Sequence, residues 1–220
     1  MFARERAMSA IEEQMYVTQL QESLLDCDRL NAEAILNDAM NRLGLKVVFN
    51  SLIPRTLNSI GQRWVNGDVA LTQIYASSRI IEDAIQKIFP SRTTSEEKKC
   101  KVVVAALDYH GLGKNILARF LNVSGVEVID LGTSVPAEII VDEAIKNKAD
   151  AILVSALMLH ACLDIGRIKQ ILNNRGANLP LIVGGAPFTF DAELWKKVSA
   201  DAMGKSVCMT FKELKGLLKK

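Results

Sequence analysis

The sequence predicts an α/β protein in which an N-terminal four-helix bundle precedes a doubly wound, five-stranded parallel sheet. Apolar residues recur at helical spacing from about residue 8 to residue 89. After residue 100, short runs of Val, Ile and Leu alternate with helix-like stretches. Between the two halves, the segment PSRTTSEEKK at residues 90–99 has a proline, hydroxyls and charges but no aliphatic or aromatic side chain. The chain therefore contains two parts of different class.

The first part reads as a bundle of helices of ordinary length. Its breaks fall at Gly44, near Pro54, and at Asn66-Gly67-Asp68. Pro54 must start or kink a helix, whereas Gly67 can end one helix and Asp68 can cap the next. We expect this helical domain at residues 1–90 and a linker at residues 91–100.

The second part, residues 101–220, reads as strands that alternate with helices. The apolar runs are KVVVAA, VEVIDLG, AILVSAL and LPLIVGG, and helix-like segments begin near Lys114, Pro136, Asp164 and Asp191. Continuous apolar runs indicate strands that are buried on both faces, and the alternation implies right-handed crossovers in a parallel sheet. A flavodoxin-like or Rossmann-like domain follows from this pattern.

Composition and charge exclude several classes of protein. The formal net charge is +2, and basic and acidic residues are interleaved, so we expect no nucleic-acid partner and no membrane partner. The longest apolar stretch, AILVSALMLHACL, is too short to span a bilayer. The four cysteines are scattered without a C-x-x-C pair, which argues against a disulfide framework and a zinc site. We expect a cytoplasmic protein.

Unusual residues follow three of the predicted strands. Asp108 and His110 come after the first strand, Ser155 and Leu157 end the third, and Gly184-Gly185 end the fourth. In such sheets, ligands bind beyond the carboxyl ends of the strands, where the strand order reverses. These three loops should therefore meet at one edge of the sheet.

The first loop does not match the common phosphate-binding patterns. The stretch LDYHGLGKN has neither the full G-x-x-x-x-G-K-[ST] pattern nor G-x-G-x-x-G. A lone histidine at a strand end is more often an ordinary loop residue than a base or a metal ligand. An aspartate two residues earlier can accept from one ring nitrogen and leave the other as a basic ligand. Gly184-Gly185 then suggest a gap in which a large ligand lies against the backbone.

Three motifs together resemble the cobalamin-binding proteins of the D-x-H-x-x-G, S-x-L, G-G type. They are Asp108-Tyr109-His110-Gly111-Leu112-Gly113, Ser155-Ala156-Leu157 and Gly184-Gly185, separated by residues 114–154 and 158–183. The helical half is similar to the helical cap that precedes the Rossmann-like module in cobalamin-dependent methionine synthase and in small corrinoid proteins. The phrases VIDLGTSVP and VGGAPFT are also typical of those corrinoid proteins.

The resemblance implies roles for these residues around a cobalamin cofactor. His110 would be the lower axial ligand to cobalt, Asp108 would hydrogen-bond the far side of its imidazole, and Ser155 would extend this relay. The nucleotide tail of the cofactor would run along a slot lined by Ser155, Leu157, Gly184 and Gly185. An imidazole suits cobalt, and its hydrogen-bond partner tunes how strongly it donates.

The resemblance also implies residues farther from the motifs. Trp64 and Val69 would pack over the upper face of the cofactor, and Met203 would approach its nucleotide tail. Corrinoid proteins commonly carry an acidic residue directly after the motif histidine and a glycine before the motif aspartate, whereas this chain has Gly111 and Leu107 there. These departures could alter the reduction potential of the cofactor or the docking of partners.

The implied function is that of a corrinoid methyl carrier. Co(I) would accept a methyl group from a substrate-specific methyltransferase, and the resulting methyl-Co(III) would pass it to a second methyltransferase that acts on tetrahydrofolate or coenzyme M. A reductive activase would be a further partner. We expect a carrier subunit of a multi-component methyltransferase rather than a self-sufficient catalyst, because the corrin does the difficult chemistry while the protein controls ligation and access.

Two other functions remain open at this point. A cobalamin-sensing transcriptional regulator or anti-repressor would usually add a winged-helix domain, whereas residues 1–45 are mixed in charge and look like bundle helices. Light-sensing regulators carry a Glu-His pair where this chain has Ile74-Tyr75. A mutase module would need a radical-generating barrel on another chain.

Overall fold

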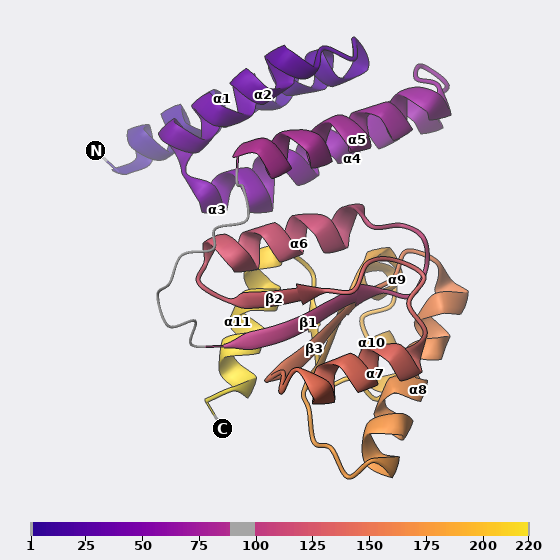
Figure 1. Ribbon diagram of the computed structural model, residues 1–220. Coiled ribbons are helices and arrows are strands. Elements are labelled where there is room, and N and C mark those ends of the chain that lie inside the picture. The colour runs from indigo at the N-terminus through magenta and orange to yellow at the C-terminus, as the bar shows by residue number, and fades with distance from the viewer. Residues whose placement is uncertain (1, 89–99, 220) are drawn as a thin grey trace. The chain divides into compact units, whose positions relative to one another are not determined.

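The computed structural model describes residues 2–88 and 100–219. The chain divides into two compact units, Met1–Pro90 and Ser91–Lys220 (Figure 1). The expected linker at residues 91–100 lies outside the described residues except for Cys100. Within the described parts of the chain, no helix is both long and apolar enough to cross a membrane.

The described residues of the first unit form helices joined by short turns (Figure 1). Its elements are α1 (Phe2–Leu25), α2 (Arg29–Leu43), α3 (Leu45–Val47), the π-helical turn η1 (Val48–Leu52), α4 (Ile53–Val65) and α5 (Leu71–Ile88). Because α3, η1 and α4 follow one another without a gap, the unit consists of four helical rods. α1 packs against α2, α4 and α5, as the predicted four-helix bundle requires.

The breaks between these helices follow the residues that the sequence singled out, with one correction. Gly44 ends α2 at a φ of 82°, and Gly67 follows α4 at a φ of 84°. Pro54 lies in the first turn of α4, directly after the π turn. The expected cap of α5 was wrong: the side chain of Gln73, not Asp68, accepts the Ala70 N–H at the start of that helix.

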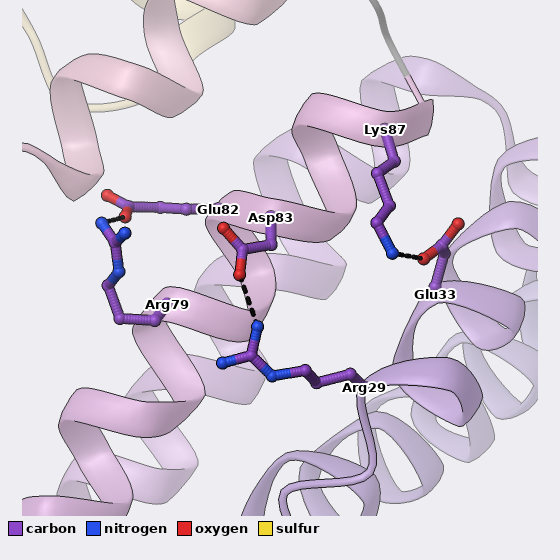
Figure 2. Close-up of polar contacts among 6 residues, drawn as sticks. All are labelled: Arg29, Glu33, Arg79, Glu82, Asp83 and Lys87. Carbon is purple, nitrogen blue, oxygen red and sulfur yellow. Dashed lines mark hydrogen bonds and ion pairs between the residues drawn. The ribbon is translucent and has the colours of Figure 1, made fainter.

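Ion pairs on the surface of the bundle join α2 to α5. Arg29 Nη1 lies 2.7 Å from Asp83 Oδ2, and Lys87 Nζ lies 2.8 Å from Glu33 Oε2. Figure 2 shows these two contacts bridging the helices, with the Arg79–Glu82 pair nearer the start of α5. Their side chains are largely exposed, so each pair contributes about 0–1 kcal/mol and mainly favours one register of the two helices.

The second unit contains five strands and the helices that connect them. Its elements are β1 (Lys101–Ala106), α6 (Leu112–Val123), β2 (Glu127–Asp130), α7 (Ala137–Lys146), β3 (Ala151–Ser155), α8 (Leu159–Asn174), β4 (Leu181–Gly184), α9 (Ala186–Phe190), α10 (Leu194–Lys197), β5 (Ala202–Gly204) and α11 (Val207–Leu217). All strand pairs are parallel, in the order β2-β1-β3-β4-β5. This is the flavodoxin-like order, and the predicted fold class is confirmed.

Alternate residues of each strand feed two separate cores. Val103, Ile152 and Val183 face α7 and α8 in one core. Val102 and Leu153 face α6 and α11 in the other. Burial on both faces explains why the strands read as continuous apolar runs instead of alternating ones.

The structure corrects one helix start and adds one helix. α8 begins at Leu159, not near Asp164, so the apolar run after β3 supplies the first turn of a helix. The short helix α9 lies between β4 and the helix that was expected near Asp191, which begins at Leu194. All four cysteines are free thiols, as the scattered spacing indicated.

Tyr16 gives a test of the packing of the bundle. Burial raises the pKa of Tyr16 to about 12, helped by the carboxylate of Asp38, which accepts a hydrogen bond from the phenol. The resulting stabilisation is complete below the unfolded-state pKa of about 10 and is lost as the pH rises toward about 12. We expect the free energy of unfolding to fall more steeply between these pH values in the wild type than in Tyr16→Phe, by urea titration. The exposed residue Tyr75 supplies the control, because Tyr75→Phe should follow the wild type.

Candidate functional site

The carboxyl ends of β1, β3 and β4 lie side by side. Ala106 of β1 pairs with Ser155 of β3, and Ser155 pairs with Gly184 of β4. β1 and β3 are also the strands at which the chain changes its direction of progress across the sheet. The structure therefore brings the three predicted motifs together at the switch point, where ligands of such sheets bind.

Asp108 joins the loop after β1 to the loop after β3. Its Oδ1 accepts the backbone N–H of His110 at 3.0 Å. Its Oδ2 accepts the backbone N–H groups of Leu157 at 2.7 Å and Met158 at 2.9 Å. The carboxylate is 6% exposed, so these three bonds replace most of its hydration.

The same contacts keep Asp108 ionised. Burial by itself would raise the pKa of Asp108, but the N–H groups of Met158, Leu157 and His110 outweigh it and lower the pKa below its ordinary value. A positive charge on His110 would act in the same direction. Asp108 therefore presents a charged carboxylate to the imidazole of His110.

His110 lies beside this carboxylate with one ring nitrogen unsatisfied. Nδ1 is 3.4 Å from Asp108 Oδ1, yet it is buried and makes no hydrogen bond with the described residues. The ring of Tyr109 stacks on the imidazole, with centroids 4.0 Å apart and planes inclined by 33°. Since Nδ1 lies on the Asp108 side, Nε2 is the nitrogen left for a ligand.

Gly184 ends β4 and Gly185 follows it, and the protein's own backbone requires a glycine at position 185. A Cβ on Gly185, whose φ is 121°, would lie 1.9 Å from the carbonyl oxygen of Ala156. A Cβ on Gly184 would lie 3.0 Å from the carbonyl oxygen of Gly204. The absent side chains therefore let the end of β4 approach the neighbouring chain segments, and the slot for a ligand beside this pair stays a prediction.

The loop after β2 packs against the loop that carries His110. Ser134 N–H donates to the carbonyl of Asp108 at 2.9 Å. A Cβ on Gly111 would come within 3.0 Å of the methyl group of Thr133, so a side chain at 111 would have to displace Thr133. Leu112 begins α6, and Gly113 lies exposed in its first turn.

Comparison with known proteins identifies the class of site. A B12 binding domain family matches residues 98–209, about half of the chain, and a second B12 binding domain family matches residues 16–88. The chain belongs to the B12-binding family. Its cofactor is cobalamin, as the three motifs indicated.

Relatives of this B12-binding protein extend over both of its units. The trimethylamine corrinoid protein of Methanosarcina barkeri is 29% identical and covers 86% of this chain and 90% of its own length. The structure of the monomethylamine corrinoid protein from the same organism has a TM-score of 0.74 at 20% identity, covering 92% and 99% of the two chains. A methanol:cobalamin methyltransferase complex, also from that organism, has a TM-score of 0.53 at 18% identity, covering 93% and 80%.

The residues at the switch point fit a corrinoid. His110 offers an imidazole whose buried Nδ1 lacks a hydrogen bond, next to a carboxylate held in its charged form. Large apolar side chains are exposed on the loops and first helical residues that follow β1 and β3 and on α9 after β4, as a flat macrocycle would require. These side chains are Tyr109, Leu157, Met158, Leu159 and Phe190.

The remaining predicted residues fall into different surroundings. Met203 lies within β5, opposite Val183, and packs partly buried against the core beside α7 and α8. Ser155 is half-buried, and it is not among the described groups that hydrogen-bond Asp108. In the helical unit, Trp64 is 47% exposed and Val69 is 5% exposed. The role of each toward the cofactor stays a prediction.

Sequence reasoning missed the groups that act through the backbone. Met158 holds Asp108 by its N–H, and a backbone donor leaves no signature in the residue type. It also missed the ion pair of Lys114 with Asp130, because Lys114 was considered only as a helix start and as part of a tested phosphate-loop pattern. A lysine in the predicted first turn of a helix would have been a signal of an acidic partner, because a cation is disfavoured at a helix N-terminus.

Replacing Asp108 tests its bonds to the two loops. Asp108→Asn must point its NH₂ group at a backbone N–H, so we expect the free energy of unfolding of the protein to fall by about 1–3 kcal/mol. Because the pKa of Asp108 is lowered in the folded protein, its carboxylate stabilises the fold fully above the unfolded-state pKa of about 3.9. This stabilisation is lost as the pH falls below that pKa and through the lower folded-state pKa. The difference between wild type and variant, from denaturant titrations, should therefore shrink below about pH 4. Asp164→Asn, at an exposed position, should show neither effect.

Replacing Gly185 tests the close approach of β4. Gly185→Ala combines a left-handed φ with a collision against Ala156, so we expect a loss of more than about 3 kcal/mol in the free energy of unfolding. Gly125→Ala has a similar positive φ of 85° but open space around the new methyl group, so it should cost about 1 kcal/mol. Equal costs for the two variants in denaturant titrations would contradict the proposed collision.

Proposed function

We propose that this protein is a methyl carrier that binds its corrinoid through His110. The observation that carries the proposal is the likeness to a trimethylamine corrinoid protein over 86% of the chain, which includes both units and the His110 loop. When bound, the corrinoid supplies a cobalt centre that takes up and releases a methyl group. The chain's own residues supply the ligand, its orientation and the surfaces around it.

His110 would bind through Nε2 and keep its proton on Nδ1. The ionised Asp108 lies on the Nδ1 side, which favours this tautomer and makes Nε2 the stronger donor. Because Asp108 is fixed by N–H groups from two loops, it can hold the imidazole in one orientation. Ser155 would take part in proton movement only after a rearrangement that brings its hydroxyl to this pair.

The partners would be two methyltransferases and an activase. A substrate-specific methyltransferase would load the carrier, and a second one would pass the methyl group to tetrahydrofolate or coenzyme M. A reductive activase would restore oxidised cofactor. The structural likeness to a subunit of a methanol:cobalamin methyltransferase complex supports a partner of the first kind. The relatives named here use different methyl donors, so the donor would be selected by the partner enzyme.

Two histidine variants test the proposed ligand. The protein should bind cobalamin in a one-to-one complex, and electron paramagnetic resonance of its Co(II) form should show splitting by a histidine nitrogen. His110→Ala should abolish this splitting and change the visible spectrum. His160→Ala removes the other histidine, which is exposed in the first turn of α8, and should leave both signals intact. Retention of the splitting in His110→Ala would refute the assignment.

A second experiment tests methyl transport itself. Reduced, cobalamin-loaded protein would be added to an extract of its own organism with labelled methanol, methylamines, methylated thiols, betaines or aryl methyl ethers. We expect label on the protein-bound corrinoid with one of these donors, and loss of that label when tetrahydrofolate or coenzyme M is added. Failure of every donor to label a protein that shows the histidine splitting would contradict the carrier function while leaving cobalamin binding intact.

A further inference from the structure

The side chain of Lys114 carries a buried charge next to the His110 loop. It lies in the first turn of α6 and is only 3% exposed. Burial of an ammonium group is costly, and a cation in the first turn of a helix also opposes the helix dipole. Stability alone would favour an apolar residue at this position. The contacts of Lys114 must therefore explain why a lysine is present here.

Its partner is Asp130, the last residue of β2. Lys114 Nζ lies 2.5 Å from both carboxylate oxygens of Asp130. Asp130 Oδ1 also accepts the backbone N–H of Gly132 at 2.9 Å. One ion pair thus fixes the start of α6, the end of β2 and the first turn of the following loop.

That following loop holds the backbone of the His110 segment. Ala106 N–H donates to the carbonyl of Gly132 at 3.0 Å, and Ser134 N–H donates to the carbonyl of Asp108 at 2.9 Å. At its carboxyl end, the segment from Asp108 to Gly111 continues directly into α6, whose first turn contains Lys114. The ion pair joins the two supports of this segment.

We propose that the Lys114–Asp130 pair is a positioning device that sets the place of His110 for axial ligation. This inference rests on the proposed role of His110. Lys114 does not touch the imidazole, and it acts by keeping the loop after β2 and the start of α6 at a fixed separation. A cation held by two oxygens at 2.5 Å resists sliding of these segments, which an apolar contact of similar size permits.

The chain offers a matched control at the opposite edge of the sheet. Lys169 Nζ lies 2.5 Å from Asp201 Oδ2, and Asp201 Oδ2 accepts the N–H of Leu181 at the start of β4. The Lys169 side chain is also largely buried, at 16% exposed. Replacing Lys169 therefore removes a comparable ion pair at the amino ends of the strands, whereas the His110 loop lies at their carboxyl ends.

The first measurement needs no cofactor. Amide hydrogen exchange would be followed at His110 and Ser134 in wild type, Lys114→Met and Lys169→Met. We expect Lys114→Met to accelerate exchange at these two amides about tenfold or more, because they bond to Asp108 within the supported loops. Lys169→Met should leave them within about twofold of wild type. Equal rates at both amides in wild type and Lys114→Met would overturn the inference.

The second measurement uses cobalamin-loaded protein. Lys114→Met should raise the dissociation constant of cobalamin about tenfold and lower the fraction of Co(II) protein with histidine-nitrogen splitting, whereas Lys169→Met should change neither. Wild type without any splitting would refute the role of His110, whatever the exchange rates show. Wild-type splitting that persists in full in Lys114→Met would refute the positioning role alone.

Two additional variants guard against loss of the fold. Asp130→Asn keeps an oxygen for the Gly132 N–H but leaves the buried Lys114 ammonium without its anion, so it should be less stable than Lys114→Met, which leaves a carboxylate that is 40% exposed. Lys114→Met combined with Asp130→Asn leaves no unpaired buried charge. Both should show the accelerated exchange and the weakened splitting while they remain folded by circular dichroism. Wild-type behaviour of the folded double variant would overturn the inference.

Discussion

The site depends on one carboxylate that satisfies three backbone donors from two loops. Asp108 binds the N–H groups of Leu157 and Met158 with one oxygen and that of His110 with the other. A neutral side chain could not accept all three bonds, and a side chain that bonded only within its own loop could not fix the distance between the two loops. Because loops are the least constrained parts of such a fold, this contact decides where the imidazole lies. The sheet itself only brings the loops to the same edge.

The fold and the site depend on different kinds of information, which explains what the sequence could predict. Continuous apolar runs predicted a parallel sheet because both faces of each strand are buried, and the five-stranded sheet has the flavodoxin-like order. The helical bundle followed from periodicity in the same way. The end of β3 was harder to predict, because an apolar run without polar or turn-forming residues is compatible with either a strand or a helix. We therefore expected α8 near Asp164, whereas it begins at Leu159.

Side-chain chemistry located the motifs but not the contacts among them. Asp108 and His110 were paired by spacing, yet the structure gives the carboxylate to backbone N–H groups and leaves Nδ1 of His110 without a bond. Gly184 and Gly185 were interpreted as space for a ligand, whereas Gly185 is needed to avoid the carbonyl of Ala156. Both differences have one cause. The sequence names the side chain at each position, whereas the close approach of two backbone segments and the hydrogen bonds from backbone N–H groups depend on residues distant in sequence.

With His110 as the axial ligand that we propose, its unsatisfied Nδ1 would connect the stability of the protein to its cofactor. A buried polar atom without a partner costs about 1–3 kcal/mol, and Asp108 Oδ1 lies only 3.4 Å away. The ring also contacts Tyr109, with centroids 4.0 Å apart, so realignment of the imidazole would have to preserve or replace this contact. Ligation through Nε2 would reorient the ring, and any orientation that lets Nδ1 donate to Asp108 recovers this cost. Part of the binding free energy of the cofactor would then come from a hydrogen bond within the protein, which couples occupancy to folding.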